Sequence, residues 1–355
     1  MRFIHMADVH LGAVPDAGFS WSEERRRDIW DTFRNCIDDC SRRQVDLLLI
    51  AGDLFHRQPS PQQLREVNYL FSTIPDTRIV LMAGNHDFIT PSSPYLTFPF
   101  SPNVSGLFSD QIECLRFPEI HTDVYGCSYS RQEIREPLYD DVEPLNSRNF
   151  KILLAHGGDD RHIPIRPDRL ARSGFDYVAL GHIHRPDILL KNKAAYSGAP
   201  EPTDAGDTGR HGYILGEVKN GHLSIRFVPK AKREYHRAQI MCSEADTTYS
   251  LRDKITACIR KNGDKDIYHF TLTGNHRPGI RFDTARLMEC GRIVDIEDQT
   301  GMAFHPEQLR REYEGQLIGR YIESFDGQDR GEVQKKALQY GLEALLATRK
   351  DNPEQ

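Results

Sequence analysis

The stretch Ile79-Val80-Leu81-Met82-Ala83-Gly84-Asn85-His86-Asp87 is an apolar run that ends in a glycine and then in amide, imidazole and carboxylate side chains. A short apolar run bounded by glycine is typical of a fully buried β-strand. In open α/β sheets, ligands bind at the carboxyl ends of the strands. The stretch therefore predicts a buried strand that presents Asn85, His86 and Asp87 at a ligand-binding edge.

Four more apolar runs of the sequence end in the same way. Asp8 and His10 are two positions apart, so on an extended strand both side chains leave the same face, and the last run repeats this spacing. A single Asp or His at a strand end is more often a turn or hydrogen-bonding residue. Five runs in succession instead favour a metal site. The four runs lead to Asp8 and His10, to Asp53, to His156, and to His182 and His184.

The residue types indicate what such a site would hold. A mixed set of carboxylate, amide oxygen and imidazole ligands suits Mn, Fe or Zn, and it differs from a thiolate-rich zinc site. Two ions held ~4 Å apart can activate a water and hold both the attacking and the leaving oxygen of a phosphoryl displacement. The sequence therefore predicts a phosphoesterase with two metal ions.

The bulk composition bounds the class of protein. A chain of 355 residues is long enough for two domains and a tail. No apolar run approaches the ~20 residues of a membrane span, so we expect no membrane association. The formal net charge of −6 counts against a simple electrostatic DNA-binding module. It counts less against a metal-dependent nuclease, because bound divalent ions supply positive charge locally.

The cysteines and the N-terminus bear on the cellular compartment. The 7 cysteines are scattered, odd in number and without a Cys-x-x-Cys motif, so we expect free thiols in a reducing, cytoplasmic compartment. The first strand reaches a predicted ligand already at Asp8, which argues against a cleavable signal peptide at the N-terminus.

Alternating strand and helix patterns over the first 90 residues predict an α/β layered core, which the pattern alone presents as a single open sheet. Ser20 and Glu23 have the spacing of a capping box. Ser60-Pro61 is typical of an N-cap followed by proline at the first helical position. The segments 212–218 and 222–228 predict a β-hairpin that closes this domain.

We predict three regions along the chain. Residues 1–229 form the phosphoesterase domain, residues 230–302 a small α+β capping domain, and residues 303–355 a C-terminal helical segment. Apolar residues recur with helical spacing on both sides of Asp326-Gly327, which predicts a helical hairpin there. Gly274-Asn275-His276 repeats part of the metal motif but lacks the following Asp, so we expect a turn.

The motifs, taken in order, resemble those of the calcineurin-like metallophosphoesterase superfamily: Asp-x-His, Gly-Asp, Gly-Asn-His-Asp, a lone His and Gly-His-x-His. This resemblance implies an α/β fold in which two β-sheets form a sandwich flanked by helices, in place of a single open sheet. It also implies that His86 is a catalytic residue that binds no metal, with Asp87 placed to orient it. By the same resemblance, Asp8, His10, Asp53 and His184 hold one ion, and Asp53, Asn85, His156 and His182 hold the other.

The residues after Asp53 resemble one branch of this superfamily. Phe55-His56 follows at once, and Pro-Ser-Pro opens a helix, as in DNA repair nucleases of the SbcD type, including the YhaO-like branch. The segment 196–200 and the small cap also resemble that branch. The resemblance implies a Mn-dependent DNA nuclease with 3'-to-5' exonuclease and some endonuclease action, in which His56 is a second active-site histidine near the scissile phosphate. The implied cofactors are two divalent ions, Mn(II).

The resemblance also implies partners and leaves alternatives open. It implies DNA as substrate, an SMC-like ATPase that the C-terminal helices dock on, and pairing of two copies through helices of the catalytic domain. The helical stripe after His305 equally fits packing within the domain. Basic residues in 161–172 and 230–237 fit either phosphate contacts or solvated surface. The alternative functions are a phosphodiesterase or phosphatase acting on a small nucleotide, and a DNA-holding subunit of an ATPase complex.

Overall fold

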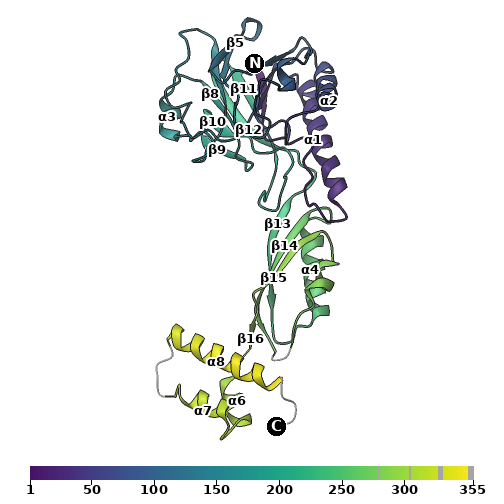
Figure 1. Cartoon of the computed structure of the whole chain (residues 1–355), viewed down its shortest axis with the longest axis vertical. Helices are drawn as coiled ribbons and strands as arrows, with labels where there is room; N and C mark the ends of the chain where they lie inside the picture. Colours follow the sequence, from purple (N-terminus) through teal and green to yellow (C-terminus); the bar gives the residue numbers. More distant parts are fainter. Residues whose placement is uncertain (278–279, 304, 327–330, 351–355) are drawn as a thin grey trace. The chain divides into compact units, whose positions relative to one another are not determined.

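The computed structural model describes residues 1–277, 280–303, 305–326 and 331–350. The chain divides into two compact units (Figure 1). The first unit comprises Met1–His236 with Lys265–Ile267, and the second comprises Arg237–Asp264 with Tyr268–Gln355. Each unit has hydrophobic cores of its own.

Two mixed β-sheets of six strands each form the first unit. The two-sheet fold implied by the resemblance is confirmed, and the single open sheet is wrong. Local apolar patterns mark each strand but do not tell which strands pair, because pairing joins residues far apart in sequence. One sheet has the order β12 (His222–Pro229), β11 (Gly212–Lys219), β1 (Arg2–Met6), β2 (Leu47–Ala51), β3 (Arg78–Met82), β4 (Val104–Gly106). The other has the order β5 (Glu113–Phe117), β6 (Thr122–Gly126), β7 (Phe150–His156), β8 (Tyr177–Gly181), β10 (Ala194–Tyr196), β9 (Asp187–Leu190).

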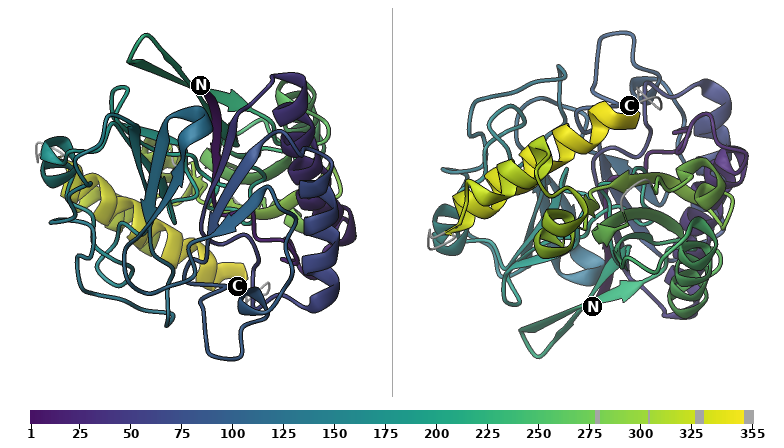
Figure 2. Two further views of the ribbon diagram at one scale, coloured as in Figure 1. Left: turned by 90° about the horizontal axis from the view of Figure 1, so that it is seen from above. Right: turned by 90° about the horizontal axis from the view of Figure 1, so that it is seen from below.

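Side chains of each central strand alternate between two cores. In β2, Leu47 and Leu49 pack toward the second sheet, whereas Leu48 and Ile50 pack against helices. Both faces of the strand are buried, so its sequence is continuously apolar. Helices α1 (Ser22–Arg42) and α2 (Pro61–Ser72) lie side by side over the outer face of the first sheet (Figure 2). The short helix α3 (Pro167–Arg172) packs on the second sheet.

The start of helix α2 confirms the predicted cap. Ser60 Oγ accepts the backbone N–H of Gln63 at 3.2 Å, and the Gln63 side chain accepts the backbone N–H of Ser60 at 2.9 Å. Pro61 occupies the first turn, where its missing N–H costs nothing. The predicted hairpin is also confirmed, since β11 and β12 pair antiparallel around Asn220-Gly221.

The predicted capping box at the start of helix α1 is wrong. The helix begins at Ser22, and its N-cap residue Trp21 makes no side-chain capping bond. Ser22 Oγ donates instead to the carbonyl of Pro15 at 2.8 Å. The spacing in the sequence predicts the cap at Ser20. In the structure, the bond from Ser22 to Pro15 in the preceding loop holds the start of the helix instead.

The parallel central strands of both sheets end at one edge of the sandwich. β1, β2 and β3 pair in parallel in one sheet, and β7 pairs in parallel with β8 in the other. The loops after these strands are joined by backbone bonds. The backbone N–H of Asp8 donates to the carbonyl of Gly52 at 3.1 Å, and that of His10 donates to the backbone carbonyl of Asp53 at 3.0 Å. This register carries the five predicted motifs to the same edge.

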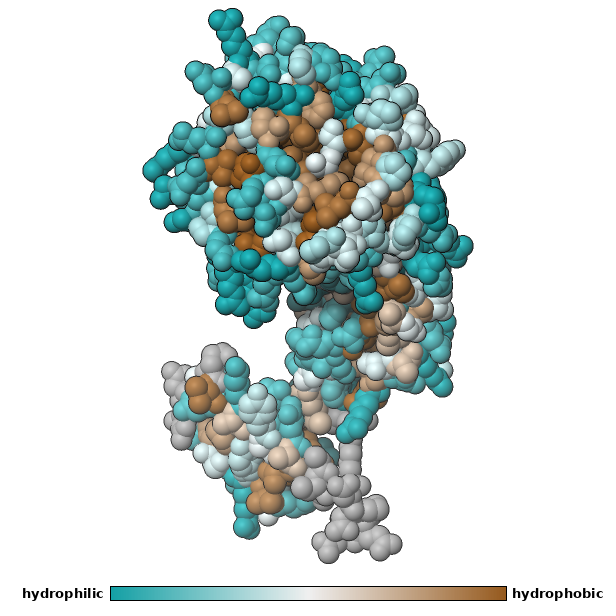
Figure 3. All heavy atoms as spheres, turned by 45° about the horizontal axis from the view of Figure 1, so that its top comes forward, coloured by the Kyte–Doolittle hydropathy of each residue, from teal (hydrophilic) through white to brown (hydrophobic). Residues whose placement is uncertain are grey.

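The core between the two sheets is fringed by partly buried hydrophobic residues. Met1, Leu115 and Ile225 are among those that pack against it. Figure 3 shows hydrophobic side chains in patches on one face of this unit, set among polar side chains. The inter-sheet core therefore reaches toward the surface at its rim.

The second unit begins with a small β-sheet. Its strands β13 (Tyr235–Cys242), β14 (Ile267–His276) and β15 (Ile293–Asp298) pair in that order, and β16 (Gly301–Met302) pairs with β14. Helices α4 (Thr248–Asn262) and α5 (Thr284–Met288) contribute to its hydrophobic core. The predicted turn at Gly274-Asn275-His276 is wrong, because Asn275 and His276 pair with β16 as the end of β14.

The C-terminal helices pack around a separate small core. Helices α6 (Pro306–Glu312), α7 (Leu317–Glu323) and α8 (Glu332–Lys350) replace the predicted two-helix hairpin. The first arm of that hairpin is broken because Gly315 adopts a left-handed φ of 75° between α6 and α7. Of the predicted turn Asp326-Gly327, Gly327 lies outside the described residues.

Two short 3-10 helices, Pro94–Leu96 and Pro118–Ile120, complete the elements of the first unit. All seven cysteines have free thiols, as predicted. Among the residues that the structure describes, none of the helices combines the length and the apolar character needed to cross a lipid bilayer.

A buried ionic network ties helix α1 to the segment that follows β10. Arg25 is 1% exposed and binds Glu201 at 2.7 Å, Asp28 at 3.3 Å and the carbonyl of Pro202 at 2.7 Å. Glu201 also accepts bonds from Thr32 Oγ1 and from a backbone N–H. Each buried charge is therefore paired, as burial requires.

Removing one partner from this network should destabilise the first unit strongly. Arg25→Met leaves the carboxylate of Glu201 buried without its cation, which costs about 3–5 kcal/mol of unfolding free energy. Arg34→Met is the matched control on the same helix, because the Arg34–Glu66 pair at 2.7 Å is about half exposed and contributes about 0–1 kcal/mol. Urea unfolding measures both variants. Equal losses would contradict the network's role.

Candidate metal centre

All seven predicted ligands lie together at the edge where the parallel strands end. His10 Nε2 lies 3.0 Å from His184 Nε2. Asn85 Oδ1 lies 2.9 Å from His156 Nε2 and 3.1 Å from His182 Nδ1. Residues from four different strand ends therefore point their polar atoms at one another.

The two carboxylates of this group lie among the imidazoles. Asp53 Oδ2 is 3.8 Å from His10 Nε2 and 3.5 Å from His156 Nε2, so it faces both halves of the cluster. Asp8 accepts the backbone N–H of His182 at 2.9 Å and lies 3.9 Å from His156 Nδ1. Asp8 and His156 are fully buried, and Asp53 is 1% exposed. Asp53 therefore lies between the imidazoles of His10 and His156.

The hydrogen bonds of the imidazoles fit a cation. The outer nitrogens of His156, His182 and His184 face a carbonyl or carboxylate oxygen at 2.8, 2.8 and 3.0 Å, so these nitrogens carry the ring protons. When the rings are neutral, the inner nitrogens carry lone pairs, as Asn85 Oδ1 and the carboxylates do. Lone pairs that converge repel one another, and a shared cation removes that repulsion. The donor types suit borderline divalent ions.

The backbone is strained at the cluster. Asp8, His10, Asp53 and His182 have φ values of 52°, 51°, 51° and 92°, in the left-handed region that non-glycine residues rarely adopt. Strain of this kind costs of order 1–3 kcal/mol per residue and gathers at functional sites, where surrounding structure holds it. Four strained residues in one group indicate that these loops adopt an unfavourable backbone conformation in order to point their side chains into the cluster.

Glycine is required where these loops approach one another. A Cβ on Gly84 would lie 2.7 Å from His156 Nε2 and closer still to Asp53 Oδ1. Gly52 has a φ of 86°, and a Cβ there would lie against the ring of His156. The glycines of the motifs therefore make room for the ligands themselves.

Two more histidines lie beside the ligand cluster. The rings of His56 and His86 stack with centroids 5.2 Å apart, and the His86 ring is 4.7 Å from that of His10. The backbone N–H of His86 donates to Asp53 Oδ1 at 2.9 Å, and the ring Nδ1 of His86 contacts the carbonyl of His56 at 3.2 Å. His56 Nδ1 is buried without a hydrogen-bond partner among the described residues, as is His10 Nδ1.

Asp87 holds the backbone of the motif loops. Its carboxylate accepts the N–H of Gly84 at 2.8 Å, the N–H of Phe55 at 3.1 Å and the hydroxyl of Tyr95 at 2.7 Å. These bonds join the loop that carries His86 to the loop that follows Asp53. The three bonds of the Asp87 carboxylate hold the loop that carries the His86 ring, and orientation of that ring by Asp87 stays a prediction.

The charges of the cluster shift the pKa values of its members. Burial alone lowers the pKa of His156, but the carboxylates of Asp53 and Asp8 outweigh it and raise the pKa to about 9. Burial likewise lowers the pKa of His184, and the bond to Asp207 together with the charge of Asp8 raises it to about 9. In His182 burial dominates and lowers the pKa to about 4.

The pKa values of the carboxyl groups shift in opposite directions. Burial raises the pKa of Asp8 to about 6 and, together with the charge of Asp53, that of Asp87 to about 7. For Asp53 burial acts the same way, but the charges of His156 and His10 prevail and hold its pKa well below the usual range. Asp53 therefore stays ionised at neutral pH.

Sequence reasoning did not find the groups that support the ligands. Asp159 and Asp207 accept the outer N–H of His182 and His184, and both lie in loops without periodic pattern. Tyr129 and Tyr139 bind the backbone carbonyl and N–H of His156 at 3.1 and 3.3 Å. No local motif marks these residues, because each acts across a long sequence separation.

The basic residues near the linker are paired with carboxylates. Lys230 binds Asp39 at 2.8 Å, and Arg233 binds Asp28 at 3.0 Å. In the other cluster, Arg166 pairs with Asp140. These pairings favour the solvated or structural interpretation of the basic clusters over free phosphate contacts.

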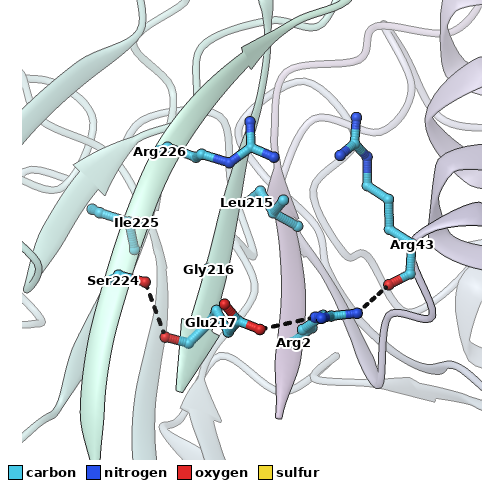
Figure 4. Close-up of a pocket in the computed structure, with 8 residues that line it drawn as sticks. All are labelled: Arg2, Arg43, Leu215, Gly216, Glu217, Ser224, Ile225 and Arg226. Atoms are coloured by element: carbon cyan, nitrogen blue, oxygen red, sulfur yellow. Dashed lines mark hydrogen bonds and ion pairs between the residues drawn. The ribbon is translucent and has the colours of Figure 1, made fainter. Parts of the chain in front are cut away.

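A separate hollow of the first unit has arginines on its rim (Figure 4). Arg2 binds Glu217 at 3.0 Å and the carbonyl of Arg43 at 3.2 Å, and Arg226 lies across from them. Its lining contains none of the predicted site residues. The hollow is therefore distinct from the ligand cluster.

A two-sheet sandwich that gathers carboxylates and imidazoles at its strand ends is the arrangement of a metal-dependent phosphoesterase. The family model for calcineurin-like phosphoesterases matches residues 1–186. The chain therefore belongs to the calcineurin-like phosphoesterase family, whose members use divalent metal ions. The resemblance inferred from the motifs is confirmed.

Relatives of the chain come from bacteria and archaea. It is 27% identical over 296 residues to the uncharacterized metallophosphoesterase YhaO of Bacillus subtilis, covering 77% of this chain and 72% of that protein. It is 30% identical over 311 residues to the DNA double-strand break repair protein Mre11 of Sulfurisphaera tokodaii, covering 78% and 74%. The match to Mre11 of Methanocaldococcus jannaschii is 29% identical and covers 57% of each chain.

Adding one methyl group at Gly84 should disable the cluster. In Gly84→Ala the new Cβ displaces Asp53 and His156, so we expect a loss of bound divalent metal with the fold retained. Equilibrium dialysis against Mn(II) with elemental analysis measures the loss. Gly331→Ala is the control, because its Cβ has an ordinary 3.5 Å contact. Wild-type metal content in Gly84→Ala would contradict the geometry.

Metal binding should weaken as the pH falls below about 9. The raised pKa values of His156 and His184 mean that the metal-free protein holds protons on both rings at neutral pH. Metal ligands must be deprotonated, so binding releases these protons and the affinity rises from pH 6.5 to pH 9. Calorimetric titration with Mn(II) in buffers of different ionisation enthalpy measures the released protons. A Kd that does not change with pH would contradict the charge assignment.

Proposed function

We propose that the protein is a Mn-dependent DNA nuclease that hydrolyses phosphodiester bonds in DNA repair. The observation that carries the proposal is the convergence of seven lone-pair donors and two further histidines at one edge of the sandwich. Phosphoesterase chemistry follows from family membership. The nuclease activity, the manganese and the 3'-to-5' exonuclease polarity with some endonuclease action are proposed.

In this proposal the donors form two sets that share Asp53. One ion takes Asp8, His10, Asp53 and His184, and the other takes Asp53, Asn85, His156 and His182. The 3.0 Å approach of His10 to His184 supports the first set, and the approach of His156 and His182 to Asn85 supports the second. When bound, two divalent ions supply an activated water and positive charge on the reacting phosphoryl group.

His86 and His56 are the residues proposed to act on the substrate directly. His86 Nδ1 is anchored on the His56 carbonyl, which directs Nε2 away from that contact and leaves it for the phosphodiester. There it can stabilise developing charge or protonate the leaving oxygen. The stacking of the His56 ring on that of His86, with centroids 5.2 Å apart, supports a contact of His56 with a phosphate oxygen of the same substrate. Asp87 keeps both loops in place.

The choice of DNA as substrate rests on the branch of the family. Several relatives, at 26–30% identity, are named DNA double-strand break repair protein Mre11. The Phe55-His56 string after Asp53 supports the same branch. An SMC-like ATPase that binds the C-terminal helices, and pairing of two copies of the chain, belong to this proposal as partners.

Single substitutions should separate metal binding from cleavage. We expect His86→Ala to keep its bound Mn(II) but to lose cleavage by 10²-fold or more, because general-acid catalysis contributes about that much. Asp53→Ala should lose metal and cleavage together, since Asp53 faces both halves of the cluster. End-labelled duplex and single-stranded DNA with Mn, Mg or chelator, together with elemental analysis, measure both effects.

His222→Ala is a control imidazole, because His222 is exposed at the start of β12, at the opposite end of the sheet from the cluster. Full cleavage by His86→Ala would contradict the catalytic assignment, and two bound ions in Asp53→Ala would contradict the ligand sets.

A substrate panel distinguishes the nuclease from the small-nucleotide alternative. Cyclic nucleotides and p-nitrophenyl esters are tested beside the labelled DNA under the same metal conditions. We expect DNA cleavage to exceed hydrolysis of the small esters. The reverse order would favour a nucleotide phosphodiesterase, and an absence of any Mn-stimulated hydrolysis would favour a DNA-holding subunit.

A further inference from the structure

Two carboxylates bind the outer faces of the Gly-His-x-His histidines. Asp159 Oδ2 lies 2.8 Å from His182 Nε2, and Asp207 Oδ2 lies 3.0 Å from His184 Nδ1. The carboxylates therefore contact different ring nitrogens in the two histidines. In each ring the opposite nitrogen points inward, Nδ1 of His182 toward Asn85 at 3.1 Å and Nε2 of His184 toward His10 at 3.0 Å.

We infer that Asp159 and Asp207 are positioning residues that fix which ring nitrogen His182 and His184 present to the metal centre. A neutral imidazole has one N–H and one lone pair, and the hydrogen bond at one nitrogen decides which is which. A carboxylate can only accept when ionised, so it holds the N–H outward and the lone pair inward. The two histidines need opposite arrangements, which their shared motif does not by itself provide.

The carboxylates are themselves held in place. Asp207 Oδ2 accepts the N–H of Thr203 at 2.8 Å and its hydroxyl at 2.9 Å. Asp159 Oδ1 accepts the N–H of Arg161 at 2.8 Å, and Asp159 also binds His162 Nδ1 at 2.9 Å. Each acceptor is thus oriented before any ion binds, and this lowers the cost of ordering the ligand ring.

The two positions differ in exposure. The side chain of Asp207 is 11% exposed and that of Asp159 is 47% exposed. Water can replace an exposed acceptor more easily than a buried one, so Asp207 should contribute more. The inference rests on the proposed metal centre, with Asp207 acting on the ion of His10 and His184, and Asp159 on the ion of Asn85 and His182.

Titration of the full chain with Mn(II), read by calorimetry and by electron paramagnetic resonance, tests this inference. Losing the outer acceptor of a metal-bound imidazole weakens metal binding about 10–100-fold. We expect the loss of affinity to be about 100-fold in Asp207→Ala and about 10-fold in Asp159→Ala. Each variant should lose affinity at only one of the two metal sites. The spectrum should change from that of a coupled pair of ions to that of a single Mn(II).

Neighbouring acidic residues provide matched controls. Asp160→Ala removes a charge next to Asp159 without removing a bond to an imidazole. Asp204→Ala removes a charge in the loop of Asp207, where the Asp204 carboxylate accepts the N–H of Gly206 at 2.6 Å. Both controls should bind two ions with wild-type affinity. Asp207→Asn and Asp159→Asn keep an acceptor oxygen but no charge, so they should recover part of the lost affinity.

Two results would overturn the inference. One is wild-type affinity at both sites in the folded alanine variants, and the other, if an alanine variant fails to fold, is wild-type affinity in the asparagine variants. Thermal unfolding in chelator shows whether each variant folds without metal. A wild-type protein that binds two ions but cleaves no DNA would refute the nuclease and leave this inference intact.

Discussion

Polar atoms of the seven predicted ligands gather at one edge of the sandwich, where each lies within 4 Å of another residue of the group. Burying carboxylates and imidazoles without compensation is costly, so a fold that does so needs a ligand to satisfy them. Left-handed backbone at Asp8, His10 and Asp53 adds to that cost. Both costs have one explanation, which is that the loops are shaped to surround divalent cations.

The other elements of the first unit position this cluster of predicted ligands. Parallel pairing within each sheet brings the strand ends to a common edge, and the inter-sheet core fixes the distance between the two groups of ligands. Gly84 lets the loops approach, while Asp87 joins the loop of His86 to that of His56. The two histidines proposed to be catalytic are therefore held by the same bonds that hold the loops of the predicted ligands.

How far the sequence predicts the molecule depends on how local the signal is. The grouping of the predicted ligands could be predicted because each follows its strand directly, and the cap at Ser60 because it involves only the next three residues. The single open sheet was wrong because strand pairing is not local. The helical hairpin was wrong because Gly315 breaks a pattern that is otherwise periodic. Asp159 and Asp207 act from loops, across more than twenty residues, so no spacing revealed them.

The central claim is that one cluster holds two cations, and anomalous X-ray diffraction at the manganese edge tests it most directly. Crystals grown with Mn(II) should show two anomalous peaks about 4 Å apart, with Asp53 between them. No peak in this cluster, or a single peak bound only by exposed carboxylates elsewhere, would contradict the account.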